Sequence, residues 1–203
     1  MPVTSDGSWG RCWPEPPEAL LDGYEAERLP VAAGVIDVST KLYAQVSSKG
    51  ALGQRRGAET QQLGLHYRGS VLSRELRSRP GALCAGDRAP DATGRDAGGG
   101  AVRLFEVFRG PHFTLLAFGD AHAGTVERVD ARHGTTVTAL RILPRGGACG
   151  EGDFVDEQGQ ARAAYDARGD ALVLVRPDGY VGLYAAPGGV EAVESYLHGV
   201  IGG

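Results

Sequence analysis

Cysteine and histidine are the side chains best suited to redox and metal chemistry, and in this chain of 203 residues they are few and scattered. The three cysteines are Cys12, Cys84 and Cys149, and no two of them form the CxxC pair that serves disulfide exchange and many metal sites. The five histidines lack the close spacing of a helical metal pair: His66, His112, His122, His133 and His198. We therefore predict no metal site. An odd cysteine number without a secretion signal predicts reduced thiols and a cytoplasmic protein.

Two further arrangements could support catalysis, and both are incomplete. Cys149 lies in a glycine-rich stretch that can form an exposed loop, so a peroxiredoxin-like enzyme acting through Cys84 or Cys149 is one alternative. No basic residue or helix N-terminus, however, is clearly placed to stabilise a thiolate. The GxGxxG turn that holds a dinucleotide pyrophosphate is absent, and the nearest sequence, residues 150–155, lacks the third glycine and follows no clear strand. We assign no catalytic and no cofactor-binding residue.

The charge of the chain argues against nucleic acid as a partner, because the formal net charge is −4. No apolar run approaches the ~18 residues that a membrane span requires, so we expect no membrane contact. Charge is nevertheless uneven, with a net of +4 over residues 51–90 and of −5 over residues 120–203. Either these stretches form two solvated faces of opposite sign, or the basic one docks on a partner surface or another domain.

A helix is predicted over about residues 18–46, from apolar positions that recur at steps of three and four. Pro30 lies inside this pattern and should either kink the helix or open a second one at its first turn. The face is apolar enough to require a partner surface, and nothing else in the first 80 residues obviously supplies one. The candidate partner-contact residues on this face are Tyr24, Arg28, Val31, Val35, Val38 and Leu42.

The last hundred residues have the pattern of a small α/β domain. Residues 112–118 and 171–175 are apolar at nearly every position, which predicts strands buried on both faces. Residues 136–143 form a further strand candidate, residues 177–179 supply a hairpin turn, and the alternation over 180–184 predicts a strand covered on one face. An apolar stripe over 190–201 predicts a closing helix. Upstream, residues 62–67 could form a short strand, whereas residues 91–100 are turn and loop material.

The order of these elements is typical of an α/β sandwich of the thioredoxin type, with a central mixed sheet and flanking helices. Five segments, in order, also match one family: residues 20–32 (LLDGYEAERLPVA), 61–70 (QQLGLHYRGS), 86–91 (GDRAPD), 103–119 and 175–181 (VRPDGYV). Together they resemble the C-terminal part of flavin-dependent aromatic-ring hydroxylases, the group that includes phenol hydroxylase-like and polyketide-tailoring monooxygenases. The resemblance runs from about residue 15 to residue 203.

This resemblance implies a division of the chain near residue 84. Residues 1–84 would be the end of an FAD/substrate domain, with the helix at about 18–46, a linker and a short strand, and residues 85–203 would be a thioredoxin-like domain.

Redox thioredoxins place CxxC after the first core strand and a cis-proline before a later one. Here these places hold residues 118–122 (FGDAH) and Ala171. Disulfide exchange is therefore not expected.

The parent family uses FAD and NAD(P)H, but its flavin-binding segments would lie upstream of Tyr24, so no cofactor is expected in this chain. We therefore expect a non-catalytic role in structure or assembly, with the apolar helix face covered by a second copy of the chain or by a separate FAD-domain subunit. The alternative is that the chain is part of a split or truncated FAD- and NAD(P)H-dependent monooxygenase, which would hydroxylate a phenol or a polyketide-like aromatic.

Overall fold

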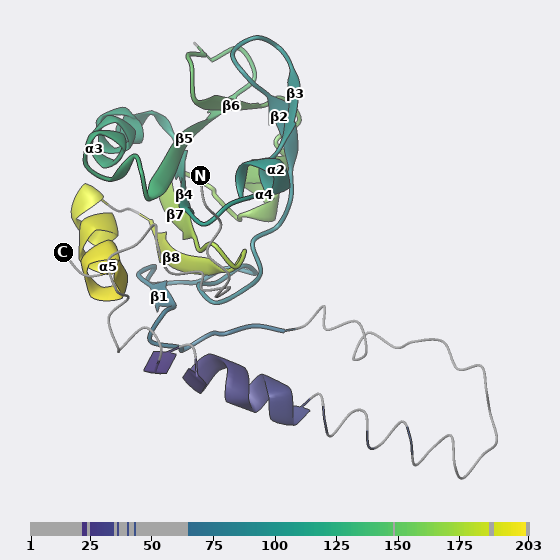
Figure 1. The fold of residues 1–203 in the computed structure, drawn as a ribbon. Helices are drawn as coiled ribbons and strands as arrows, with labels where there is room; N and C mark the ends of the chain where they lie inside the picture. Colours follow the sequence, from purple (N-terminus) through teal and green to yellow (C-terminus); the bar gives the residue numbers. More distant parts are fainter. Residues whose placement is uncertain are drawn as a thin grey trace, which may run out of the picture.

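The computed structural model describes residues 22–23, 25–34, 36, 40, 43, 65–147, 149–186 and 189–201. Residues 25–34 form an uninterrupted stretch of helix, and the isolated residues 36, 40 and 43 are helical as well. This helical segment lies beside a domain built from the rest of the described chain, and it points away from that domain (Figure 1). Pro30 therefore does not open a second helix, although its ring removes one backbone hydrogen bond.

The domain is organised around one mixed sheet of eight strands among the described residues, in the order β1-β8-β7-β4-β5-β6-β2-β3. The strands are β1 (Arg74–Glu75), β2 (Thr93–Arg95), β3 (Ala101–Arg103), β4 (Phe113–Phe118), β5 (Val137–Pro144), β6 (Asp153–Asp156), β7 (Ala171–Val175) and β8 (Val181–Ala185). The helices are α2 (Leu104–Val107), the 3₁₀ turn η1 (Asp120–His122), α3 (Ala123–His133), α4 (Gln160–Ala164) and α5 (Val190–Ile201).

The pairing of the central strands is that of a thioredoxin-like sandwich, as the sequence predicted. β4 runs parallel to β5, to which it is connected through α3, and antiparallel to β7. β7 and β8 form an antiparallel hairpin, and α5 follows it. Helices α3 and α5 lie on one side of the sheet, and α2 and α4 on the other (Figure 1). This covering buries every residue of β4 and β7, which explains their uninterrupted apolar sequences.

Several local predictions were wrong. Residues 65–67, the described part of the strand predicted at 62–67, have no regular structure, and the segment 91–100 contains the short strand β2. The strand β8 is buried at all five positions rather than on one face, because its neighbours β1 and β7 and both hydrophobic clusters surround it. The predicted closing helix is confirmed over Val190–Ile201, and its buried stripe also includes Tyr196.

Candidate functional site

The helical segment is attached to the domain by a buried ion pair. Glu27 lies on this helix, and Arg176 lies at the end of the β7–β8 hairpin, 149 residues further along the chain. The guanidinium donates two hydrogen bonds to the carboxylate, Nη1 to Oε1 at 2.8 Å and Nη2 to Oε2 at 2.7 Å. The Glu27 side chain is only 2% exposed, and the Arg176 side chain is only 7% exposed. A bidentate contact of this kind fixes both the position and the orientation of the two side chains.

The hairpin turn supplies a second carboxylate to the same arginine. Asp178 accepts hydrogen bonds from Nε of Arg176 at 3.1 Å and from Nη2 at 2.6 Å. The turn is closed by the backbone N–H of Gly179, which donates to the carbonyl of Arg176 at 2.9 Å, and Gly179 has a φ of 81°. Because this left-handed conformation favours glycine, the PDG sequence fixes the loop that carries both charged groups. On the helix side, Arg28 lies 3.6 Å from the Asp178 carboxylate.

Two aromatic rings pack against the charged side chains of this cluster. The rings of Tyr67 and Tyr180 meet edge to face with their centroids 4.6 Å apart. The guanidinium carbons of Arg28 and Arg176 lie 5.4 and 5.8 Å from the centroid of Tyr67, within the range of cation–π attraction. Tyr67 is buried, so the ring also screens the ion pairs from water. The helix, the segment at Tyr67 and the hairpin thus meet in one polar cluster.

The electrostatics of the cluster favour the ionised forms of both buried partners. Burial by itself would raise the pKa of the Glu27 carboxyl, but hydrogen bonds from Arg176 and Ser70 and the charge of Arg176 hold that pKa below its ordinary value. Burial would likewise lower the pKa of Arg176, and the pairs with Glu27 and Asp178 instead raise it. Helix and domain are therefore held together by opposite charges at neutral pH.

A match to a known family decides what kind of domain this is. The family described as aromatic-ring hydroxylase, C-terminal, matches residues 83–203. The chain belongs to this family. It is 39% identical over 187 residues to a flavin-dependent monooxygenase of Mycobacteroides abscessus, covering 91% of this chain and 32% of that protein. It is also 30% identical over 203 residues to pentachlorophenol 4-monooxygenase of Sphingobium chlorophenolicum, covering 88% of this chain and 37% of that protein.

Solved structures agree with this assignment. Aklavinone-11 hydroxylase, solved with FAD and aklavinone, superposes with a TM-score of 0.66 at 26% identity, over 90% of this chain and 35% of that one. The flavin-dependent monooxygenase PieE, at 20% identity, shares the fold with a TM-score of 0.62 over 89% and 40% of the two chains. The resemblance found in the sequence is confirmed. This hydroxylase C-terminal chain spans about a third of the length of the curated relatives it matches.

Two of the six predicted partner-contact residues lie among the described residues, both on the helical segment. Arg28 is half-buried in the cluster with Asp178, and Val31 is half-buried one turn further along. The other four lie outside the described residues: Tyr24, Val35, Val38 and Leu42. Sequence reasoning missed Glu27 and Arg176, although the segments that carried the family resemblance contain both.

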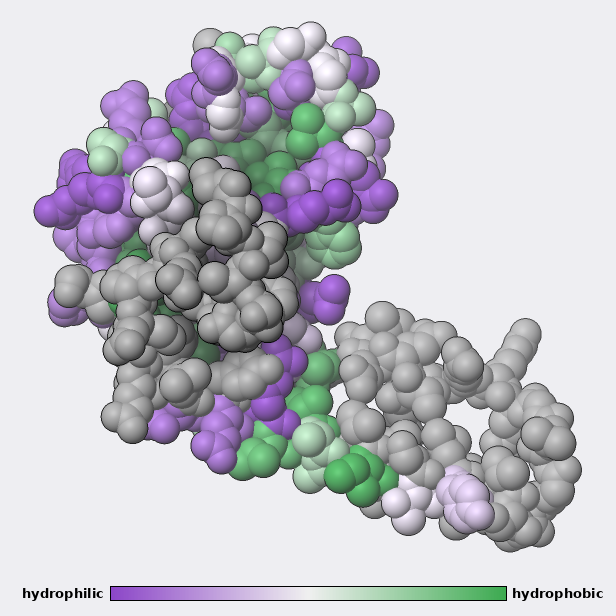
Figure 2. All heavy atoms as spheres, in the orientation of Figure 1, coloured by the Kyte–Doolittle hydropathy of each residue, from purple (hydrophilic) through white to green (hydrophobic). Residues whose placement is uncertain are grey.

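A second row of apolar side chains was also missed, and it lies on the exposed side of the helix. Leu29, Ile36 and Tyr43 are 60%, 67% and 78% exposed. Figure 2 shows hydrophobic surface along this segment. The three residues are seven positions apart, so they lie on nearly the same side of a helix. Their spacing could have been read from the sequence.

The two cysteines among the described residues provide little support for thiol chemistry. Cys149 is exposed, and burial together with the charges of Asp153 and Asp96 raises the pKa of its thiol, which disfavours the reactive thiolate. Cys84 is half-buried, with its thiol 3.6 Å from the carbonyl of Gly81. Among the described residues, no group of three or more His, Cys, Asp or Glu side chains could hold a metal ion. No helix in the described part of the chain is long and apolar enough to cross a membrane.

The glycine-rich stretch nearest to a dinucleotide-binding motif does not have the structural context of a pyrophosphate site. The glycine-rich stretch 150–155 connects β5 to β6 and leads into a strand, not into a helix. A pyrophosphate site of the dinucleotide-binding type needs a strand, a glycine-rich turn and the N-terminus of a helix in succession. This stretch therefore lacks the helix N-terminus, and with it the helix dipole, that such a site uses.

Proposed function

We propose that this chain is a non-catalytic C-terminal region of a flavin-dependent aromatic hydroxylase, which serves in structure and assembly. The observation that carries the proposal is the buried Glu27–Arg176 pair, which joins the helical segment to the domain at 2.7–2.8 Å. Charged groups this deeply buried are costly unless they are paired, so such a contact favours one relative placement of helix and domain. We assign no catalytic, cofactor-binding or metal-binding residue to the chain.

In this proposal the chain has two parts. Residues 1–84 form the end of an FAD/substrate domain, and residues 85–203 form the thioredoxin-like domain without CxxC. FAD and NAD(P)H would act in the part of the parent enzyme that this sequence does not contain, and the substrate would be a phenol or a polyketide-like aromatic. The names of the matched relatives support this substrate class, since they include a pentachlorophenol monooxygenase and an aklavinone hydroxylase.

The helix is the surface through which the proposed assembly takes place. Its partner-contact face carries Tyr24, Arg28, Val31, Val35, Val38 and Leu42, and the exposed row Leu29, Ile36 and Tyr43 adds to the apolar area. Isolated apolar residues are common on protein surfaces, but exposed apolar residues that recur on one side of a helix are consistent with an interaction site. For the accessory role the proposed partner is a second copy of the chain, whereas a separate subunit that carries the FAD domain is the partner that a split enzyme requires.

Sedimentation velocity over a range of concentrations tests this assembly role, together with binding of a dye that reports exposed hydrophobic surface. We expect concentration-dependent association or dye binding, and we expect Ile36→Glu to reduce either signal. Phe105→Glu is the matched control, because Phe105 is a large apolar residue, 44% exposed, that lies on α2. A monomer that binds no dye at any concentration would contradict the proposal.

The alternative is that the chain is one part of a split or truncated monooxygenase. The matched relatives favour it, because this chain covers only 32% and 37% of their lengths. The two functions predict different partners. Co-purification of the tagged chain with a protein that carries bound flavin would favour the split enzyme, whereas self-association alone would favour the accessory domain.

A further inference from the structure

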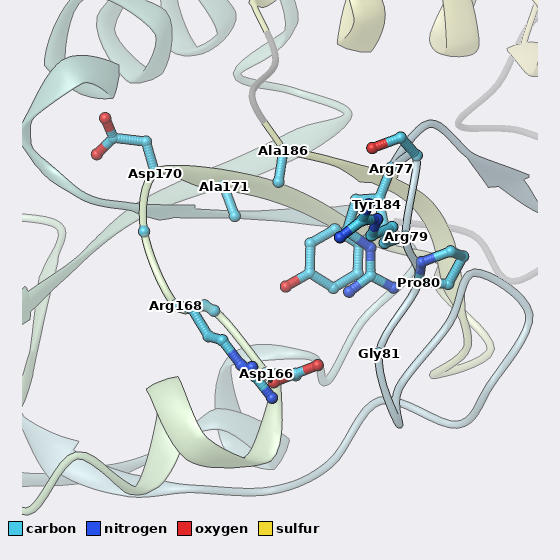
Figure 3. Close-up of a pocket in the computed structure, with 13 residues that line it drawn as sticks. Arg77, Arg79, Pro80, Gly81, Asp166, Arg168, Asp170, Ala171, Tyr184 and Ala186 are labelled. Atoms are coloured by element: carbon cyan, nitrogen blue, oxygen red, sulfur yellow. Dashed lines mark hydrogen bonds and ion pairs between the residues drawn. The ribbon is translucent and has the colours of Figure 1, made fainter.

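A hollow of about 690 Å³ opens at the edge of the sheet where β4 and β8 end and β7 begins. The loop 77–81 and the loop 166–170 enclose it from opposite sides, as Figure 3 shows. Its size is within the range of sites that hold small molecules. It lies away from the helix-docking cluster, since neither Glu27 nor Arg176 contributes to its wall.

The base of the hollow is rigid. The ring of Tyr184 is fully buried, and its hydroxyl donates to the carbonyl of Tyr165 at 2.7 Å. The guanidinium of Arg77 stacks on this ring, 3.4 Å from its centroid. Arg77 is itself fixed by two hydrogen bonds of 2.8 Å to Glu75 and by a third, of 2.6 Å, to the carbonyl of Leu83. A site whose base is already ordered loses little entropy when a ligand binds.

The rim of the hollow carries hydrogen-bond donors that remain available to a ligand. Arg79 is exposed, and no described residue accepts a hydrogen bond from its side chain or forms an ion pair with it. Arg168 lies on the other loop, where its Nε donates to the Asp166 carboxylate at 3.1 Å, and its side chain is 89% exposed (Figure 3). Pro80, Ala171 and Ala186 add apolar surface between the charged groups.

The second loop is held in an unusual conformation. Asp166 has a φ of 50°, the one non-glycine residue with positive φ in the described part of the chain. Its carboxylate fills the space beside Gly81, where an added Cβ would lie 1.5 Å from Oδ2. A side chain at position 81 would therefore displace the Asp166 carboxylate from its position between the two loops. Backbone conformations of this kind occur preferentially at ligand sites.

We propose that this hollow binds a small organic anion, a carboxylate with a compact apolar body. Arg79 and Arg168 hold the carboxylate from opposite loops, and the apolar part lies against Pro80, Ala171 and Ala186. Asp170, which also lines the hollow, disfavours a ligand with more than one negative charge. The proposal does not depend on the role of the helix or on the flavin chemistry of the parent enzyme.

The test uses benzoate as the probe, with benzyl alcohol as its uncharged counterpart and inorganic phosphate as a compact anion. In ¹H–¹⁵N NMR titrations we expect saturable shifts for benzoate at residues 77–81 and 166–171, and no saturation for benzyl alcohol. The double variant Arg79→Gln/Arg168→Gln should weaken benzoate binding at least about tenfold, as loss of charge-assisted hydrogen bonds implies. Arg109→Gln, an exposed arginine after α2, is the control and should bind like the wild type.

Three results would overturn the proposal. The first is the absence of saturable shifts in the two loops. The second is equal benzoate affinity in the wild type and the double variant, which would show that the arginines do not hold the carboxylate. The third is phosphate binding as tight as benzoate binding, which would show that the hollow attracts anions in general and does not recognise the apolar part of benzoate. None of these outcomes bears on flavin retention or association, so a failure here is separate from a failure of the proposed function.

Discussion

At the scale of single residues, the Glu27–Arg176 pair is the contact whose loss should cost most. Arg176→Ala leaves two carboxylates, Glu27 and Asp178, without the guanidinium that neutralises them. Removing one partner of a buried ion pair typically costs about 3–5 kcal/mol, because the remaining charge stays desolvated. We expect a loss of that order in the free energy of unfolding, measured by urea denaturation.

The control for this prediction is an ion pair at the surface. Arg95 and Glu157 meet at 3.0 Å, but their side chains are 49% and 40% exposed. Exposed pairs contribute about 0–1 kcal/mol, so Arg95→Ala should change the unfolding free energy little. Equal effects of Arg176→Ala and Arg95→Ala would show that the buried pair has no special role in holding the helix.

His122 gives the domain a pH dependence near neutrality. The residue is 4% exposed, and its Nε2 has no hydrogen-bond partner among the described residues. Burial lowers the pKa of His122 below its ordinary value of 6.5, although the charge of Asp170 acts in the opposite direction. The folded state therefore prefers the neutral ring. This contribution to stability is complete above about pH 6.5 and is lost as the pH falls below that value, because the unfolded state takes up the proton first.

The matched variant for His122 is His122→Gln, which cannot take up a proton. We expect the wild type to lose more unfolding free energy than this variant between about pH 7.5 and pH 5.5. The carboxylates with lowered pKa, such as Glu27 and Glu75, lose their contribution at lower pH, so they do not obscure the comparison. Parallel pH profiles for the two proteins would contradict the assignment.

At the scale of elements, the contact between β8 and α5 depends on a glycine. An added Cβ at Gly182 would lie 2.3 Å from the hydroxyl of Tyr196, which is buried and donates to the carbonyl of Leu72 at 2.9 Å. Gly182→Ala should therefore displace Tyr196 and lower the unfolding free energy by about 1–3 kcal/mol, the usual cost of overpacking. Thermal and urea denaturation measure the change.

Gly199 on α5 is the matched position for this substitution. Nothing lies within 4 Å of a Cβ built there, and alanine is a better helix former than glycine. Gly199→Ala should leave stability unchanged or raise it by up to about 1 kcal/mol. If Gly182→Ala proved as well tolerated as Gly199→Ala, the close packing of β8 against α5 would be disproved.

The sequence was informative for the elements with the most buried residues. β4 and β7 are buried on both faces and α5 is buried along one face, so their apolar residues form runs or a stripe that are visible without a structure. β1 and β3 have two and three residues, and α2 and α4 have four and five. Segments this short cannot display the repeat of apolar residues by which a strand or a helix is identified in a sequence. These elements form because the central sheet provides strands to pair with and a surface to cover.

At the scale of the whole molecule, the sequence could not show which charges meet. The basic stretch at residues 51–90 suggested a solvated face or a docking surface, and the structure shows two of its arginines paired with acidic residues of the same stretch, which leaves its net charge of +4 unchanged. Arg68 pairs with Asp87 at 2.6 Å, and Arg77 pairs with Glu75 at 2.8 Å. The Glu27–Arg176 contact spans 149 residues and is created by the fold, so no local pattern predicts it. The family resemblance marked both segments, but it did not indicate that they touch.

We propose that this C-terminal hydroxylase region has no flavin site of its own. The most direct test is to mix the purified chain with excess FAD, remove free FAD by desalting, and record the visible absorption and the far-ultraviolet circular dichroism. We expect a colourless protein with the circular dichroism of a folded α/β domain. A flavin band that stays with the folded protein would contradict the proposal and would favour an enzyme that binds its cofactor through residues other than a glycine-rich turn.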